Sequence, residues 1–67
     1  MEVEHLIQAY GRGTARMYLY RVEFRDVIGC IQEFWTFRKD DDTEFHFVNA
    51  DLAVIFAEQN QWEVVDF

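Results

Sequence analysis

Twelve of the 67 residues are aromatic (seven Phe, three Tyr and two Trp), and this density constrains the fold more than any other feature. A domain of this length buries only about 60% of the surface that its unfolded chain exposes, so its stability is marginal. Such small domains usually gain support from disulfides, a metal or a second subunit. The lone cysteine, Cys30, excludes an internal disulfide and a Cys-rich zinc site. The chain must therefore fold by dense aromatic packing, and part of its aromatic surface is expected to face a partner.

The length and composition predict one small domain over residues 1–67. No apolar run approaches the roughly 20 residues of a membrane-spanning helix. The N-terminal residues lack the basic and apolar regions of a signal peptide. Because a single free thiol is typical of intracellular proteins, we expect a cytoplasmic protein that does not bind membranes.

The N-terminal segment is open to two interpretations. Val3, Leu6, Ile7 and Tyr10 follow the i, i+3, i+4, i+7 spacing of one helical face. Gly11 then stands where a helix C-cap belongs. The alternative is a strand that turns through residues 11–13 into the next strand. The spacing favours a short helix.

Three strands of an antiparallel meander are predicted over residues 15–27, 30–38 and 44–48. The first is expected to place its even-numbered aromatic residues inward and to alternate Arg21, Glu23 and Arg25 outward, as an ion-paired face. The second carries apolar side chains on both faces, which is typical of a sandwiched strand or an interface. A polar turn over residues 39–43 joins the second and third strands.

A helix over residues 50–59 is predicted from its first residues. Asn49 is a good N-cap, and Asp51 places a negative charge in the first turn, where the helix dipole favours it. Asn60 is expected to end the helix in a left-handed conformation, and residues 62–67 to form a returning strand. The fold class is therefore α+β: a small antiparallel sheet, a three-stranded meander plus a C-terminal strand, packed against one helix, with a short N-terminal helix as an option. The predicted core is Tyr20, Val22, Phe24, Ile31, Phe45, Phe47, Leu52, Ile55, Phe56 and Val64.

Charge divides the chain into two parts. All six Lys and Arg residues lie between Arg12 and Lys39, whereas the chain from Asp40 onward carries eight acidic residues and no basic one. The formal net charge of −7 opposes binding to nucleic acid and to anionic membranes. A charge distribution of this kind steers association with partners.

Three clusters could carry chemistry, and none has the required framework. The acidic turn of residues 40–42, with Glu44 and His46 nearby, lacks the glycine and the spaced carboxylates of a calcium loop. Cys30 has no surrounding motif that would make it a nucleophile. Residues 11–14 resemble part of a phosphate loop but lack its lysine. The sequence therefore predicts no enzyme, no metal site and no cofactor.

Two alternatives to a protein-binding function stay open. The strand region interleaves Arg12, Arg16, Arg21 and Arg25 with tyrosines, a composition found in platforms for single-stranded nucleic acid. The other alternative is a structural homo-oligomer, in which Trp35 or Phe37 lies at the interface between copies. Self-association is expected in any case, because one chain is too small to cover both faces of the second strand.

The acidic half favours a binding module that masks a basic, nucleic-acid-binding site on another protein. Inhibitors, immunity proteins, antitoxins and phage or mobile-element proteins that block a host enzyme have this composition, which is an analogy of class. Acidic residues would steer the association, and two tryptophans would anchor it, because Trp is enriched at binding hot spots. The predicted partner-binding residues are Trp35, Asp40, Asp41, Asp42, Glu44, Glu58, Trp62, Glu63 and Asp66.

Overall fold

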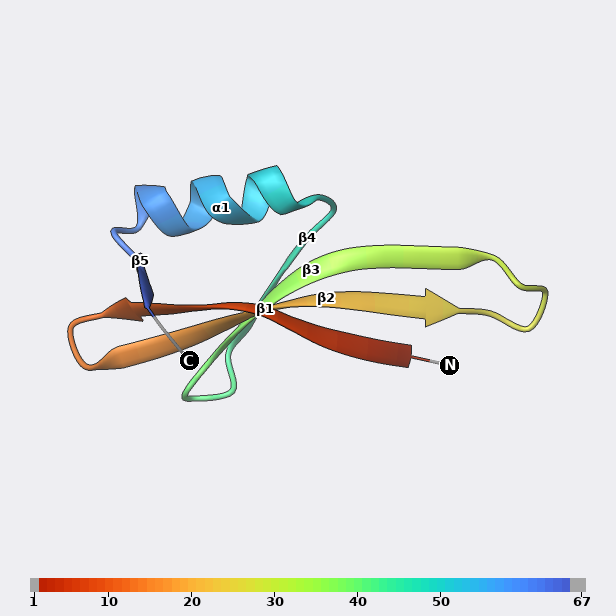
Figure 1. The fold of residues 1–67 in the computed structure, drawn as a ribbon, viewed down its shortest axis with the longest axis horizontal. Helices are drawn as coiled ribbons and strands as arrows, with labels where there is room; N and C mark the ends of the chain where they lie inside the picture. The colour runs from red at the N-terminus through yellow and green to blue at the C-terminus, as the bar shows by residue number, and fades with distance from the viewer. Residues whose placement is uncertain (1, 66–67) are drawn as a thin grey trace.

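A computed structural model describes residues 2–65 as one antiparallel sheet with a helix on one face (Figure 1). The elements are β1 (Glu2–Arg12), β2 (Ala15–Arg25), β3 (Ile31–Lys39), β4 (Glu44–Phe47), α1 (Ala50–Gln59) and β5 (Glu63–Val65). The five strands lie in the order β4-β3-β2-β1-β5, so the last strand pairs with the first. The α+β class and the meander are as predicted, and the sheet has one strand more than expected. Asp66 and the end of the predicted last strand lie outside the described residues.

The prediction of an N-terminal helix is wrong, because residues 2–12 form β1. This strand pairs with β2 along its whole length, with a β-bulge between Leu6 and Gln8. Val3 and Tyr10 lie on one face of the sheet, opposite Glu23 and Met17, whereas Leu6 lies on the other, opposite Tyr20. Apolar residues on both faces, with a bulge between them, thus imitate helical spacing. Gly11 is therefore a strand residue and no helix cap.

Helix α1 has the predicted bounds and the predicted start. The Asn49 side chain accepts a hydrogen bond from the Leu52 N–H at 2.9 Å. The C-terminal end differs from the prediction, since the left-handed residue is Gln61, with φ 65°, and not Asn60. The Gln61 N–H donates to the Glu58 carbonyl at 3.1 Å, and the Trp62 N–H donates to the Ala57 carbonyl at 2.9 Å. These two bonds form a Schellman motif, which turns the chain back toward the sheet.

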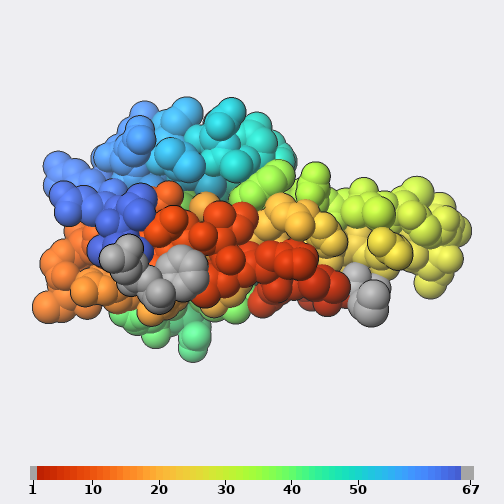
Figure 2. Space-filling view, in the orientation of Figure 1, coloured from red at the N-terminus to blue at the C-terminus, as the bar shows by residue number. Residues whose placement is uncertain are grey.

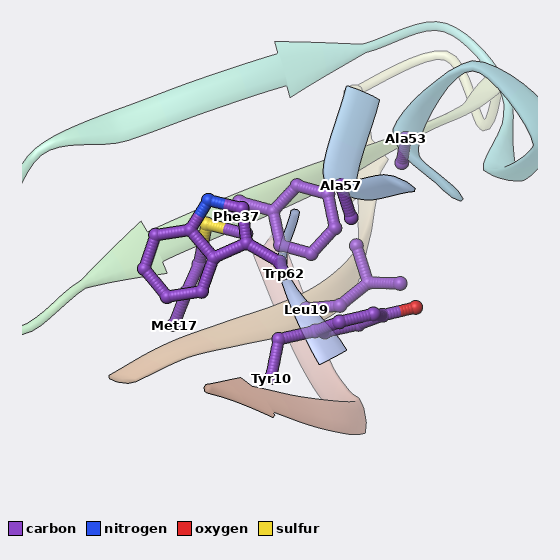
Figure 3. Close-up of a cluster of buried hydrophobic side chains, with 7 residues drawn as sticks. All are labelled: Tyr10, Met17, Leu19, Phe37, Ala53, Ala57 and Trp62. Atoms are coloured by element: carbon purple, nitrogen blue, oxygen red, sulfur yellow. The ribbon is translucent and has the colours of Figure 1, made fainter. Parts of the chain in front are cut away.

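The core lies between α1 and the sheet face that carries Met17, Leu19 and Phe37 (Figure 3). Phe37 is fully buried, and its ring meets the Tyr10 ring edge-on at a centroid distance of 5.3 Å. The helix approaches through Ala53 and Ala57, because these small side chains allow it to lie close to the rings. Trp62 is also part of this core.

The predicted core is correct only in part. Val22 is buried as predicted, and Phe45, Phe47 and Phe56 pack against the core. Tyr20 is only half-buried. Five predicted core residues are exposed: Phe24, Ile31, Leu52, Ile55 and Val64. Tyr20 and Phe24 differ from the prediction because the helix covers the odd-numbered residues of β2 and β3, whereas the prediction had placed the even-numbered residues of β2 inward. Leu52 and Ile55 differ because α1 turns Ala53 and Ala57 to the sheet instead.

The helix covers only one end of the sheet. The distal parts of β1, β2 and β3, residues 2–7 and 20–34, extend beyond α1 as a three-stranded ribbon, here called the arm (Figures 1 and 2). The molecule measures 44 × 20 × 19 Å, and its radius of gyration is 12.7 Å. A compact domain of this length has a radius of gyration of about 11 Å. The arm therefore adds surface without a covering layer.

Candidate partner-binding surface

Two arginines of the strands, Arg21 and Arg38, form ion pairs with carboxylates of the same chain. The Arg21 guanidinium bonds to Glu23 and, at 3.0 Å, to Glu33 on the neighbouring strand. These hydrogen bonds raise the pKa of Arg21, and the bond from Arg21 lowers the pKa of Glu23. The predicted ion-paired face is thus confirmed at Arg21.

Arg38 forms a second bridge on the opposite face of the sheet. Its guanidinium lies 2.9 Å from a Glu4 carboxylate oxygen and 3.0 Å from one of Glu44, and it stacks 4.9 Å from the Tyr20 ring centroid. The hydrogen bonds to Glu4 and Glu44 raise the pKa of Arg38. Glu44, which was predicted to steer a partner, is therefore held in an ion pair.

Arg12 and Arg16 tie the β1–β2 turn to its surroundings. Arg12 donates to the Asn60 carbonyl at 2.9 Å and lies 4.5 Å from the Trp62 ring centroid. The Arg16 guanidinium donates to the carbonyls of Gly13 and Ala15. Arg12, Arg16 and Arg21, which belong to the nucleic-acid alternative, thus make hydrogen bonds within the chain. Bonds to carbonyls leave the charges of Arg12 and Arg16 in place, whereas the carboxylates of Glu23 and Glu33 offset the charge of Arg21.

The structure places the two tryptophans differently from the prediction. Only 6% of Trp62 is exposed, and its ring packs in the core beside Met17 (Figure 3). It is not available as an anchor on the surface of the folded chain. Trp35 is half-buried, opposite Arg21 and Phe47 on the helix-bearing face. Burial therefore excludes Trp62 as a surface anchor, and Trp35 stays a prediction.

The Asp40–Asp42 turn is exposed at the end of the sheet that carries the β1–β2 turn. Asp40 accepts a hydrogen bond from the Arg16 N–H at 3.0 Å, which connects the two turns. Asp41 accepts one from the Thr43 N–H at 3.1 Å, and hydrogen bonds from the side chain and backbone of Thr43 lower the pKa of Asp41. Asp42 has φ 67° and completes the turn. The carboxylates thus hold the loop and still face solvent.

Further carboxylates lie on α1 and β5. Asp51, Glu58 and Glu63 are exposed. Glu58 is close enough to Tyr10 to raise the pKa of that phenol, although burial of Tyr10 contributes more. Within residues 2–65, no ion pair involves Asp51, Glu58, Glu63 or the Asp40–Asp42 turn. Glu2 and Asp26 also lack an ion pair in that range, so these six carboxylates are part of the unpaired negative charge of the described residues.

An apolar stripe on the outer face of α1 was missed by the sequence prediction. Leu52 and Ile55 are three residues apart, so they are neighbours on one side of the helix, and Val48 precedes the Asn49 N-cap just before α1. All three are exposed. Asp51 and Glu58 flank this stripe. The sequence did contain a signal for this exposed face. Ala53 and Ala57 are four residues apart among larger apolar residues, so either the alanine face or the larger apolar face of the helix could be the buried one.

Neither a membrane-spanning helix nor a metal-binding cluster is present among the described residues. Between residues 2 and 65, no helix is long and apolar enough to span a membrane. No cluster of three or more His, Cys, Asp or Glu side chains in that range is arranged to hold a metal ion. His46 lies 3.5 Å from Glu44 and shares a 3.0 Å hydrogen bond with the Thr36 hydroxyl. The turn, Glu44 and His46 therefore do not converge on one point.

Comparison with known proteins gave no match to a protein-family model, a curated protein or a solved structure.

Proposed function

We propose that this protein is a non-enzymatic binding module that uses the outer face of α1 and the neighbouring carboxylates to mask a basic surface on another protein. The observation that carries the proposal is the apolar stripe of Val48, Leu52 and Ile55 flanked by Asp51 and Glu58. An apolar centre with a polar rim is the usual anatomy of a protein interface. Because Asp51 and Glu58 are negatively charged, the surface of the partner is expected to be positively charged.

Steering is assigned to the charges that no cation of the described chain compensates. Glu58 and Glu63 lie near the end of the sheet that carries the Asp40–Asp42 turn, so the field of this end is negative. Such a field raises the association rate with a basic protein. A nucleic-acid-binding site is the commonest strongly basic surface on an intracellular protein, and an inhibitor or antitoxin that occludes such a site in the cytoplasm would use this arrangement.

Capture experiments with matched variants test this function. Immobilised protein is exposed to nuclease-treated lysate of the source organism, and the bound proteins are identified and ranked by isoelectric point. The wild type is expected to retain a basic protein, whereas Leu52→Ser with Ile55→Ser is expected to lose it. The control, Val27→Ser with Ile28→Ser on the arm, is expected to retain it.

Association kinetics with the captured protein then separate steering from anchoring. Asp51→Asn with Glu58→Gln is expected to lower the on-rate, and the wild-type on-rate is expected to fall with added salt, because screening acts within about 8 Å at physiological ionic strength. Glu2→Gln with Glu33→Gln changes the net charge equally, on the arm, and is expected to have a smaller effect. Capture that depends on intact nucleic acid, or equal loss in both charge variants, would contradict the proposal.

A further inference from the structure

The tip of the arm is the most exposed apolar segment among the described residues. Val27 and Ile28 are 103% and 80% exposed, and Phe24 and Ile31 flank them, also exposed. The same tip is hollowed, because Phe24, Arg25, Asp26 and Val27 line a pocket of about 390 Å³. A projecting apolar pair beside an apolar hollow is a shape that can complement a second copy of itself.

The arm also has unpaired edges within the described chain. β5 pairs only with residues 9–11 of β1, and β4 pairs only with residues 35–38 of β3. Residues 2–7 and 31–34 are thus sheet edges with free backbone hydrogen-bonding groups, and α1 does not reach them (Figure 1). Apart from Val22, which is buried, the apolar side chains of the arm are half-buried or exposed, because the ribbon has no covering layer. Contact with another polypeptide would supply that layer.

The charges at the tip of the arm favour a second copy over other occupants. Residues 24–31 contain one arginine and one aspartate, so the tip has no net charge, whereas the whole arm carries five acidic and two basic residues and is negative. Arg21 is bridged to Glu23 and Glu33 at the base of the tip. An anionic membrane would require an excess of Lys and Arg, and a basic partner would be attracted to the carboxylates at the other end. Two copies that each carry −7 can approach most easily where the charge is balanced.

We infer that the arm is a self-association surface, through which two copies pack tip and ribbon against each other about a twofold axis. Residues 2–7 and 20–34, about 20 in number, match the 20–30 residues that each side of a standard interface contributes. Such an interface buries about 800 Å² per partner, roughly a sixth of the 4750 Å² accessible surface of one chain. Of the two predicted interface residues, Phe37 is fully buried in the core and Trp35 is half-buried, so the proposed contact lies instead at Phe24, Val27, Ile28 and Ile31.

Sedimentation equilibrium over a concentration series tests the inference on the full chain. The wild type is expected to form a dimer at micromolar concentration. Val27→Ser with Ile28→Ser is expected to raise the dimer dissociation constant at least about 100-fold, because each dimer loses four buried aliphatic side chains. Val48→Ser, at another exposed aliphatic residue just before the N-cap of α1, is the control and is expected to leave the constant unchanged.

Labelling of Cys30 gives a second readout that needs no substitution. This thiol is exposed on the arm tip, so its rate of reaction with a maleimide should fall as the protein concentration rises through the dimer range. A wild type that stays monomeric at high micromolar concentration would overturn the inference. So would a dimer that survives the arm substitutions, is lost in Val48→Ser, or leaves Cys30 equally reactive at all concentrations. A monomer that binds neutral phosphatidylcholine vesicles through the tip would reassign the arm to membranes.

Discussion

Replacing Phe37 by Ala should remove most of the stability of the domain. The ring is 0% exposed and lies 5.3, 6.1 and 6.0 Å from the centroids of Tyr10, Phe47 and Phe56. Truncation of a buried Phe to Ala costs about 3–5 kcal/mol, through lost transfer free energy and the cavity left behind. A 67-residue domain has a total unfolding free energy of about 3–10 kcal/mol. We therefore expect the variant to be largely unfolded, or to have its urea midpoint lowered by about 2 M or more.

Phe24→Ala is the matched control, because it removes the same side chain from the same sheet at a position 45% exposed. Its cost should stay below about 1.5 kcal/mol, in proportion to the area that the ring buries. Both variants are measured by urea titration with circular dichroism, at concentrations low enough that contact between arms contributes little. A loss below about 1 kcal/mol for Phe37→Ala, or equal losses in the two variants, would refute the assignment of the core to the helix-bearing face.

Three further changes test the local structure. Asn49→Ala should lower the unfolding free energy by about 1 kcal/mol, measured by urea titration, because the Leu52 N–H loses its cap. The hydrogen bond from Arg21 lowers the pKa of Glu23, so the contribution of Glu23 to the unfolding free energy is present above the pKa of the unfolded chain and is lost as the pH falls. The unfolding free energy of Glu23→Gln should therefore fall less steeply with acid than that of the wild type. Burial raises the pKa of Tyr10, so the contribution of Tyr10 to the unfolding free energy is present below pH about 10 and is lost above it. Tyr10→Phe should therefore flatten the alkaline limb of a stability profile.

The parts of the fold that the sequence predicted correctly depend on local signals. The start of α1 was predictable because Asn49 caps a backbone N–H three residues away, and the β3–β4 turn because its residues are polar and of hairpin length. The strand β1 was not predictable, because a bulge and apolar residues on both faces of the sheet produce the spacing of a helix. The left-handed residue at the helix end was misplaced by one position, since a Schellman motif requires it at Gln61.

The sequence predicted the negative charge of the candidate site but not the apolar side chains proposed as its anchors. The carboxylates of residues 40–42, Glu58 and Glu63 are exposed, as acidic side chains of a small domain usually are. Trp62 is in the core because the Schellman turn directs it under α1. Conversely, Ile55 is outside because alanines, and not the larger residues, allow the helix to approach the sheet. Size alone does not tell which face of a helix is buried when both are apolar.

The pairing of β5 with β1 has a consequence for the order in which the chain assembles. The β1–β2 and β2–β3 hairpins join neighbouring segments, whereas the contact between Arg12 and Asn60 spans 48 residues. Hairpins form in about 1–10 μs, and closing a longer loop costs more conformational entropy before its contacts form. We expect the meander to appear first during refolding, with α1 and β5 docking late. Because Trp62 belongs to that last segment, its fluorescence would time the moment at which the domain becomes complete.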